Sequence, residues 1–321
     1  MNTQRLTSPY HDLTHGWHGF VVFYVLIAVF SLAGLQKSGF ALIPAFLKKD
    51  GRFFRTEALL LSLCLAPTLT PAIVVRHDRD ATLFEQLGRQ FPSTVMLRHG
   101  DGKDGLGGEG TLINRNWVLT AAHVASDLRP GDPVTILGKI YKIERVVIYP
   151  DWHHDADMPV DIALVRLTES VTDVVPARPY TGTDELGMVA TLVGRGQQGT
   201  GLTGAVPHEG TVLAATNRVE STLDVFPGTA ARGQYPAEGF QLRFTFDAPG
   251  DPNATDLEGI CGGGDSGGPA YVKQGDVLYV IGVSSGQDSR PANRKVGRYG
   301  VFEYYTRVSH FAKWIRRVLG N

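Results

Sequence analysis

The sequence predicts an all-β fold for the larger, carboxy-terminal part of the chain. The chain of 321 residues contains 38 glycines and 18 prolines, and both residue types end strands and form turns. Short strand-like runs recur between these turns, whereas helical periodicity is rare. At about 100–200 residues per domain, the length fits one or two domains with additional segments.

The amino-terminal region, residues 1–72, differs in composition from the rest. Residues 17–35 contain no charged side chain and approach the ~20 residues that cross a bilayer. Lys and Arg outnumber Asp and Glu in residues 36–57, and the apolar run 58–66 precedes small residues and prolines. That order is typical of a secretory signal peptide. We therefore expect the rest to be exported, periplasmic or secreted, with membrane contact through these segments alone; alternatively, residues 1–46 are not translated.

Charge and cysteine content limit the partners of the folded part. A formal net charge of −1 gives no reason to expect a nucleic acid partner. Because Cys64 lies in the apolar amino-terminal run, it is an unsuitable partner for Cys261, and we expect no disulfide. Cys261 is expected to be a small buried residue. The His and Asp side chains of residues 150–157 are adjacent rather than spaced around one point, which predicts a solvated loop and no metal site.

The first half of the folded part contains one short helix followed by strands. Residues 80–90 place apolar side chains at helical spacing, which predicts an amphipathic helix. The Gly- and Asp-rich run 100–105 predicts a hairpin loop. The expected strands are residues 93–98, 110–113, 117–119, 134–137, 139–149 and one that Asp161 opens.

The second half repeats this pattern and ends in a helix. Residues 176–187 are expected to connect the two halves, and residues 194–204 and 230–239 are predicted loops. Apolar side chains at helical spacing in residues 309–319 predict a terminal helix that packs on the body. The expected strands are residues 188–194, 210–225, 240–246, 269–273, 277–284 and 299–307.

A glycine-rich turn at residues 264–269, Gly-Asp-Ser-Gly-Gly-Pro, is the main indication of chemistry. Glycine permits positive φ and close approach of other groups, and proline fixes the direction in which the chain leaves. Such a turn can expose the Ser266 hydroxyl beside backbone N–H groups. An acyl-transfer nucleophile needs that arrangement, because the N–H groups bind the oxyanion.

Two upstream residues supply the partners that this hydroxyl requires. A serine becomes nucleophilic when a base takes its proton, and a carboxylate orients that base. His123 ends the run Thr-Ala-Ala-His, and Asp161 begins the run Asp-Ile-Ala-Leu. With these contexts in the order His, Asp, Ser, the chain from about residue 73 resembles the chymotrypsin/trypsin family of serine endopeptidases. The α/β-hydrolase motif Gly-x-Ser-x-Gly does not apply, because there the acid and the histidine follow the serine.

The resemblance implies a fold and a domain organisation. It implies two six-stranded Greek-key antiparallel barrels and a C-terminal helix within a protease domain of residues 73–321. The first barrel would span about residues 93–175, the second about 188–308, and the helix 309–319. The cysteine pair that animal members carry beside the histidine is absent, so the chain resembles bacterial-type members without the usual disulfides.

The resemblance also implies roles for single residues. His123 would act as general base and then acid, Asp161 would orient it, and Ser266 would form the acyl-enzyme. The N–H groups of Gly264 and Ser266 would form the oxyanion hole. The expected function is a serine endopeptidase that acts on a protein or peptide substrate without a cofactor. The alternative is a catalytically silent binding module on the same fold.

The expected substrate pocket departs from the family pattern. Its floor falls on Ile260 or, because of an extra glycine in the following segment, on Gly259, and neither is the aspartate with which trypsin selects Arg and Lys. Ser284 and Gly286 would form the opposite wall. The register places Glu303 near this pocket, where its carboxylate would attract a basic side chain; a solvated strand residue is the alternative.

Removal of the amino-terminal region offers an activation step. Cleavage after Ala72 would leave Ile73 and Val74 as the new terminus, and family members often begin Ile-Val. Their terminal ammonium pairs with the acid before the nucleophile, here Asp265. We therefore expect export processing to activate the enzyme through an ion pair between Ile73 and Asp265, which orders the oxyanion loop.

Overall fold

The computed structural model describes residues 46–49, 52–55, 73–100, 107–153, 160–207, 211–223 and 239–320. The chain divides into two compact units, Met1–Ala66 and Pro67–Asn321. In the first unit the described residues form an antiparallel hairpin of β1 (Phe46–Lys49) and β2 (Arg52–Arg55), which the sequence analysis did not predict. The apolar segments 17–35 and 58–66 lie outside the described residues. Among the residues that are described, no helix combines the length and apolarity needed to cross a bilayer.

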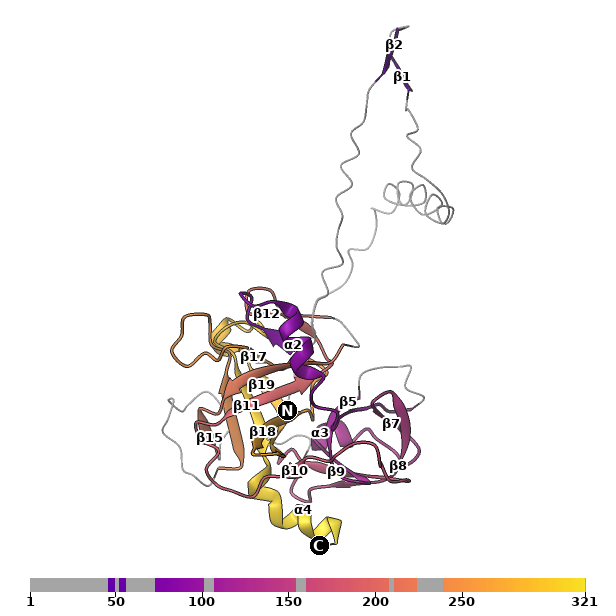
Figure 1. The fold of residues 1–321 in the computed structure, drawn as a ribbon, viewed down its shortest axis with the longest axis vertical. Coiled ribbons are helices and arrows are strands. Elements are labelled where there is room, and N and C mark those ends of the chain that lie inside the picture. The colour runs from indigo at the N-terminus through magenta and orange to yellow at the C-terminus, as the bar shows by residue number, and fades with distance from the viewer. Residues whose placement is uncertain are drawn as a thin grey trace, which may run out of the picture. The chain divides into compact units, whose positions relative to one another are not determined.

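The first half of the larger unit forms a closed antiparallel barrel in the strand order β4-β5-β6-β9-β8-β7 (Figure 1). Alternating side chains of these strands, such as Val95, Leu112 and Leu164, are fully buried in its core. The six strands are β4 (Thr94–Leu97), β5 (Gly108–Asn114), β6 (Trp117–Thr120), β7 (Pro133–Ile136), β8 (Lys139–Ile148) and β9 (Ala163–Leu167). The expectation of a six-stranded first barrel is therefore confirmed.

The second half forms an eight-stranded sheet with the path β14-β11-β18-β19-β20-β16-β15, and β10 pairs in parallel with β19. In the described part of the chain this sheet stays open, so the second barrel of the expected fold is a half-barrel there. Its strands are β10 (Arg178–Pro179), β11 (Val189–Gly194), β14 (Leu213–Arg218), β15 (Ser221–Leu223), β16 (Gln241–Thr245), β18 (Pro269–Gln274), β19 (Val277–Asp288) and β20 (Phe302–Arg307).

The remaining described strands of the larger unit form two small two-stranded sheets. β3 (Ile73–Val75) pairs with β17 (Gly259–Ile260), which places the start of the folded unit beside the segment leading to Ser266. β12 (Gln198–Thr200) pairs with β13 (Gly204–Val206). The prediction of a loop at residues 194–204 was therefore wrong in part, because Gly204 at φ +76° turns this Gly-rich run into a tight hairpin.

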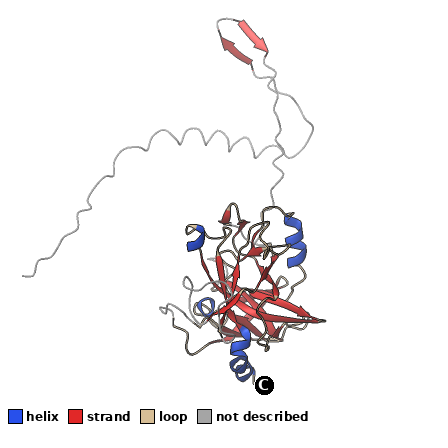
Figure 2. Cartoon of the chain, turned by 90° about the vertical axis from the view of Figure 1, so that its left-hand side faces the viewer, coloured by secondary structure: helices blue, strands red, loops and turns tan. Residues whose placement is uncertain are grey.

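Short helices lie at the margin of the strands (Figure 2). α2 (Ala81–Gly88) confirms the predicted first helix, and Asp80 caps its first turn by accepting a hydrogen bond from Thr82 N–H. α3 (Ala122–Ala125) is a single turn after β6. The chain ends in the 3₁₀ helix η2 (Val308–Phe311) and α4 (Ala312–Leu319), as predicted, and η1 (Arg290–Ala292) precedes β20.

The two halves share one apolar core. Leu112 and Val118 of the barrel belong to the same buried cluster as Val193, Tyr271 and Val283 of the second sheet. A polar contact crosses the same boundary, since the Tyr271 hydroxyl lies 3.0 Å from Ser93 Oγ. Segments from both halves therefore meet at a fixed boundary, and the candidate site lies along it.

Candidate active site

Strand register brings His123 and Asp161 together. β6 and β9 pair antiparallel with Thr120 opposite Ala163, so the residues just after β6 meet those just before β9. His123 Nδ1 lies 2.7 Å from Asp161 Oδ2, and the His123 backbone N–H donates to Asp161 Oδ1 at 2.9 Å. With a carboxylate as acceptor, the proton resides on Nδ1, and Nε2 is left as a base.

Burial and charge act in opposite directions on this pair. Asp161 is 2% exposed, whereas the His123 side chain is 38% exposed. Burial lowers the pKa of His123, but the hydrogen bond and the charge of Asp161 outweigh it and hold the pKa above the ordinary histidine value. The imidazolium form is therefore stabilised by Asp161, as a proton-accepting base requires.

Two hydroxyls from the second sheet also hold Asp161, and the sequence analysis missed both. Ser285 Oγ on β19 donates to Asp161 Oδ2 at 2.6 Å, and Thr306 Oγ1 on β20 donates to the Asp161 carbonyl at 2.8 Å. Ser285 lies between Ser284 and Gly286, the two residues expected to form the pocket wall. Its neighbour Ser284 instead faces Glu303, because successive strand residues point to opposite sides.

Ser266 lies in a tight turn between β17 and β18, here called the serine turn (residues 262–268). Gly264 at φ +96° and Gly267 at φ +80° adopt conformations that favour glycine. Main-chain hydrogen bonds fix the turn: Gly268 N–H donates to the Asp265 carbonyl at 2.9 Å, and Gly267 N–H donates to the Ser284 carbonyl at 2.8 Å. The local conformation expected from the glycines is thus present.

The serine turn packs directly against the segment that carries His123. An added Cβ at Gly267 would overlap Thr120 Oγ1 and would lie 3.1 Å from Ala121 N. An added Cβ at Gly108 would lie 2.7 Å from the Ser266 carbonyl oxygen and 2.8 Å from Val124 Cγ2. The Ser266 backbone and the residues on both sides of His123 are therefore neighbours across the boundary of the two halves.

The predicted oxyanion-hole residues Gly264 and Ser266 lie on either side of Asp265 in the serine turn. Within the described part of the chain, neither backbone N–H group donates a hydrogen bond. The turn between them is held by Asp265, which is buried and accepts from Gly262 N–H at 2.8 Å and Gly196 N–H at 2.6 Å. Burial raises the pKa of Asp265 to about 6, and these amides oppose the rise.

The predicted pocket residues are only partly brought together. Glu303 accepts from Cys261 N–H at 2.7 Å and from Ser284 Oγ at 3.1 Å, and burial raises its pKa to about 8. Gly286 pairs with Tyr304 and has open space where a Cβ would stand. The Ile260 side chain, in contrast, is fully buried in an apolar cluster with Val74, Phe246 and Val301.

Cys261 is a buried free cysteine, which confirms the expectation that this residue is buried. Its Sγ lies 2.8 Å from the Tyr305 hydroxyl, and burial raises the pKa of the thiol well above its ordinary value. The neutral thiol is therefore the stable form. Among the described residues no group of three or more His, Cys, Asp or Glu side chains is placed to hold a metal ion.

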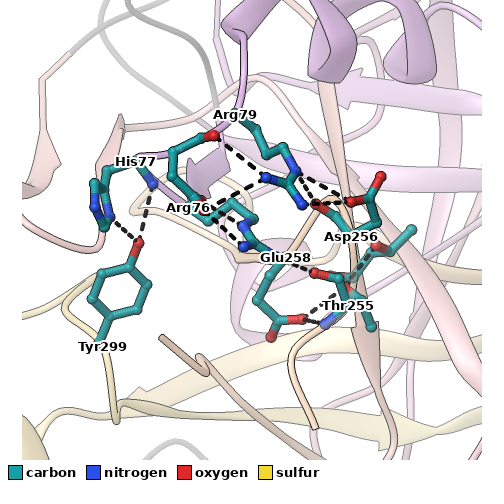
Figure 3. Close-up of polar contacts among 9 residues, drawn as sticks. Arg76, His77, Arg79, Thr255, Asp256, Glu258 and Tyr299 are labelled. Atoms are coloured by element: carbon teal, nitrogen blue, oxygen red, sulfur yellow. Dashed lines mark hydrogen bonds and ion pairs between the residues drawn. The ribbon is translucent and has the colours of Figure 1, made fainter. Parts of the chain in front are cut away.

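The segment after Ile73 is bound to the loop that precedes β17 (Figure 3). The Arg76 guanidinium donates to the Thr255 carbonyl at 2.6 Å, and Arg79 pairs with Asp256 at 2.7 Å. The His77 N–H donates to the Tyr299 hydroxyl at 3.0 Å. These contacts fix residues 73–79 beside β17, the strand that leads into the serine turn.

Comparisons with known proteins agree with the observed fold. The family model described as Trypsin matches residues 84–315. Chymotrypsin-like elastase family member 1 of Homo sapiens is 27% identical over 243 residues, which are 66% of this chain and 81% of that protein. Snake venom serine proteinase 14 of Crotalus adamanteus is 29% identical over 227 residues, 66% of this chain and 77% of that protein. Complement C1s subcomponent of Rattus norvegicus is 28% identical over 240 residues, 66% of this chain and 32% of that protein, so this chain spans about a third of that relative.

Proposed function

Because this chain belongs to the trypsin family, whose family model covers residues 84–315, we propose that it is a serine endopeptidase with His123, Asp161 and Ser266 as its catalytic residues. Two contacts carry the proposal together. His123 and Asp161 form a 2.7 Å hydrogen bond, and the serine turn packs on the segment that carries His123. The substrate class is protein or peptide.

The proposed reaction proceeds in two acyl transfers. His123 Nε2 takes the proton of the Ser266 hydroxyl, and Ser266 Oγ attacks the peptide carbonyl. The N–H groups of Gly264 and Ser266 bind the resulting oxyanion, and His123 returns the proton to the leaving amine as the C–N bond breaks. Water then hydrolyses the acyl-enzyme by the same steps. Asp161 stabilises the imidazolium throughout, and no cofactor or metal is required.

Labelling by a serine-directed phosphonate tests this proposal. We expect the wild-type chain to be labelled at Ser266, and Ser266→Ala to lose both labelling and casein turnover while its circular dichroism and melting temperature stay unchanged. Ser289→Ala is the matched control, because that serine makes no capping hydrogen bond at the start of η1. Equal labelling of Ser266→Ala and the control would refute the proposed nucleophile.

The same experiment separates an enzyme from a silent binding module on this fold. A module would show neither labelling nor turnover of any peptide in a library, even with the described fold intact. The proposed enzyme turns over at least one member of such a library, and that turnover depends on Ser266.

The substrate pocket is proposed to accept a basic side chain through Glu303. Ser284 and Gly286 are the proposed wall, and the hydrogen bond from Ser284 Oγ to Glu303 supports this placement, whereas Ile260 is buried in a separate apolar cluster. Glu303 is the buried acidic side chain at this end of β20, and its charged form can pair with a basic group. It supports a preference for Lys or Arg at the first subsite, although the aspartate that serves this purpose in trypsin is absent.

Export and processing complete the proposal. The composition of residues 1–72 supports transport out of the cytoplasm, with any membrane contact made by these segments. Cleavage before Ile73 would free an ammonium group next to β17, which leads to Asp265. We propose that this group pairs with Asp265 and increases activity.

A further inference from the structure

A largely buried ion pair adjoins the serine turn through the backbone of Glu109. Arg195, just after β11, donates through its guanidinium to Glu109 Oε2 on β5 at 2.8 Å, and more weakly to the Thr94 carbonyl at 3.5 Å. The Glu109 side chain is 2% exposed and that of Arg195 is 20% exposed. The pair therefore connects the second sheet to the first barrel from within the protein.

The backbone around Arg195 closes on Asp265. Gly196 N–H donates to Asp265 Oδ1 at 2.6 Å. An added Cβ at Gly194 would overlap the Asp265 carboxylate, and one at Gly196 would lie 2.7 Å from Asp265 N. Residues 194–196, here called the glycine cradle, therefore pack directly against the serine turn. Displacement of Arg195 would also displace the Gly196 N–H group that donates to Asp265.

The other end of the ion pair reaches Ser266 and the histidine segment. Glu109 N–H donates to the Ser266 carbonyl at 2.7 Å, and the Glu109 carbonyl accepts from Thr120 Oγ1 at 2.7 Å. A series of contacts thus connects Arg195 through Glu109 to Ser266. A further contact joins Asp265, the neighbour of Ser266, to the glycine cradle that contains Arg195. Glu109 belongs to the first barrel and Arg195 follows a strand of the second sheet, so both halves of the fold contribute to these contacts.

The charges of Arg195, Glu109 and Asp265 favour the same arrangement as these hydrogen bonds. Glu109 and Asp265 are buried carboxylates, and burial raises the pKa of each. The positive charge of Arg195 lowers both, which favours their ionised forms. Buried ion pairs contribute little net stability compared with apolar residues of similar size, but they can fix one arrangement. The expected effect of this pair is therefore on geometry more than on folding.

We propose that Arg195 is a positioning residue for the oxyanion hole: held by Glu109, it fixes the glycine cradle against Asp265 and thereby orients the Gly264 and Ser266 N–H groups. This arrangement exists in the uncleaved chain, where no terminal ammonium is available. We therefore expect the uncleaved protein to have activity before any processing. The inference rests on the proposed function of Ser266.

The test uses the full-length chain, with mass spectrometry to confirm that residues 1–321 are intact. Arg195→Met is expected to lower kcat and the rate of phosphonate labelling by about 10²-fold, the loss typical of a misplaced oxyanion donor, with KM changed by less than about threefold. Arg195→Lys should recover at least about tenfold of that loss, because an ammonium still pairs with Glu109. Arg218→Met is the matched control, since its guanidinium bonds the Gly187 carbonyl at the surface.

A double variant separates positioning from stability. Glu109→Met with Arg195→Met removes both charges, so the melting temperature should be unchanged or higher while the labelling rate stays low. A labelling rate for Arg195→Met within about threefold of wild type would overturn the inference. Loss of activity only in proportion to loss of folded protein would overturn it as well.

Failure of the inference and failure of the proposed function give different results. An uncleaved wild-type chain without labelling or turnover overturns the inference. If the same chain is labelled after cleavage before Ile73, the serine endopeptidase stands and its activation depends on the new terminus. If it stays unlabelled after cleavage, both proposals fail.

Discussion

The carboxylate of Glu303 accepts hydrogen bonds from the Cys261 amide and the Ser284 hydroxyl in a site where burial raises its pKa to about 8. Below that pH the group is mostly protonated, and above it the group is charged. Because a Lys or Arg side chain at the first subsite needs a charged partner, its recognition should strengthen as the pH rises through about 8. The dependence should appear in kcat/KM, which reports the ionisation of the free enzyme.

The measurement is the ratio of kcat/KM for two peptides that differ only in a basic or neutral residue at the first subsite. Titration of His123 affects both peptides equally and cancels in the ratio. We expect the ratio to rise between about pH 7 and 9 in the wild type, and to be low and flat in Glu303→Gln. A wild-type ratio that is constant across this range would rule out Glu303 as the selecting group.

What could be inferred at the residue scale depended on local sequence context. His123, Asp161 and Ser266 each stand in a short recognisable run, and strand register brings His123 to Asp161. The hydroxyls of Ser285 and Thr306 that hold Asp161 are separated from it by more than a hundred residues. Their role follows from the pairing of distant strands, which no local pattern encodes. The same holds for Arg195 and Glu109.

At the scale of elements, patterns with strong periodicity were predicted well and short polar elements were not. The strands of the first barrel and the helices α2 and α4 follow the expected ranges, because each contributes apolar side chains to the buried core. The hairpin of β12 and β13 was missed, since Gly, Thr and Gln give no apolar alternation. The single turn α3 was missed as well, because four residues are too few to show a helical period.

The serine turn gives a prediction that belongs to this scale. An alanine at Gly267 would meet Thr120 Oγ1 and the Glu109 carbonyl and would also be strained at φ +80°. We expect Gly267→Ala to lower kcat/KM by at least about 10²-fold, because the turn must move away from the histidine segment. Gly275→Ala supplies the control, since Gly275 has φ +58° and open space around its Cβ position.

Both substitutions carry the backbone cost of positive φ, about 1 kcal/mol, in the free energy of unfolding measured with urea. Only Gly267→Ala adds the steric overlap at the site. Activity of Gly275→Ala should therefore stay within about twofold of wild type. Similar activities for the two variants would mean that the close packing of the serine turn on the histidine segment has no role in turnover.

At the scale of the whole molecule, the site depends on a boundary between two halves that share one core. Contacts across it come from β5, from Asp161 just before β9, from β19 and β20, and from the serine turn. Residues 73–79 stabilise the same region, because β3 pairs with β17 and Arg76 binds the loop that precedes β17. Composition and the resemblance could indicate two barrels, but not which distant side chains would join them.

The backbone at Ile73 connects this architecture to processing. Ile73 is fully buried and has φ +68°, a conformation that costs a β-branched residue about 1–2 kcal/mol or more. The torsion φ is defined by the carbonyl of residue 72, so cleavage after Ala72 removes this constraint. The new ammonium would then be a second cation for the Asp265 region, in addition to Arg195.

Two cations that act on one carboxylate should partly replace each other. We expect cleavage before Ile73 to raise the phosphonate labelling rate several-fold in the wild type and by a larger factor in Arg195→Met, whose Asp265 lacks the other support. The measurement uses full-length chains with the recognition sequence of a site-specific protease in place of residues 68–72, each labelled before and after cutting. As control, acetylation of the new terminus should abolish the gain. Equal gains in the two backgrounds would show that Arg195 and the terminus act on separate steps, and no gain in either would leave the ion pair between Ile73 and Asp265 without a role.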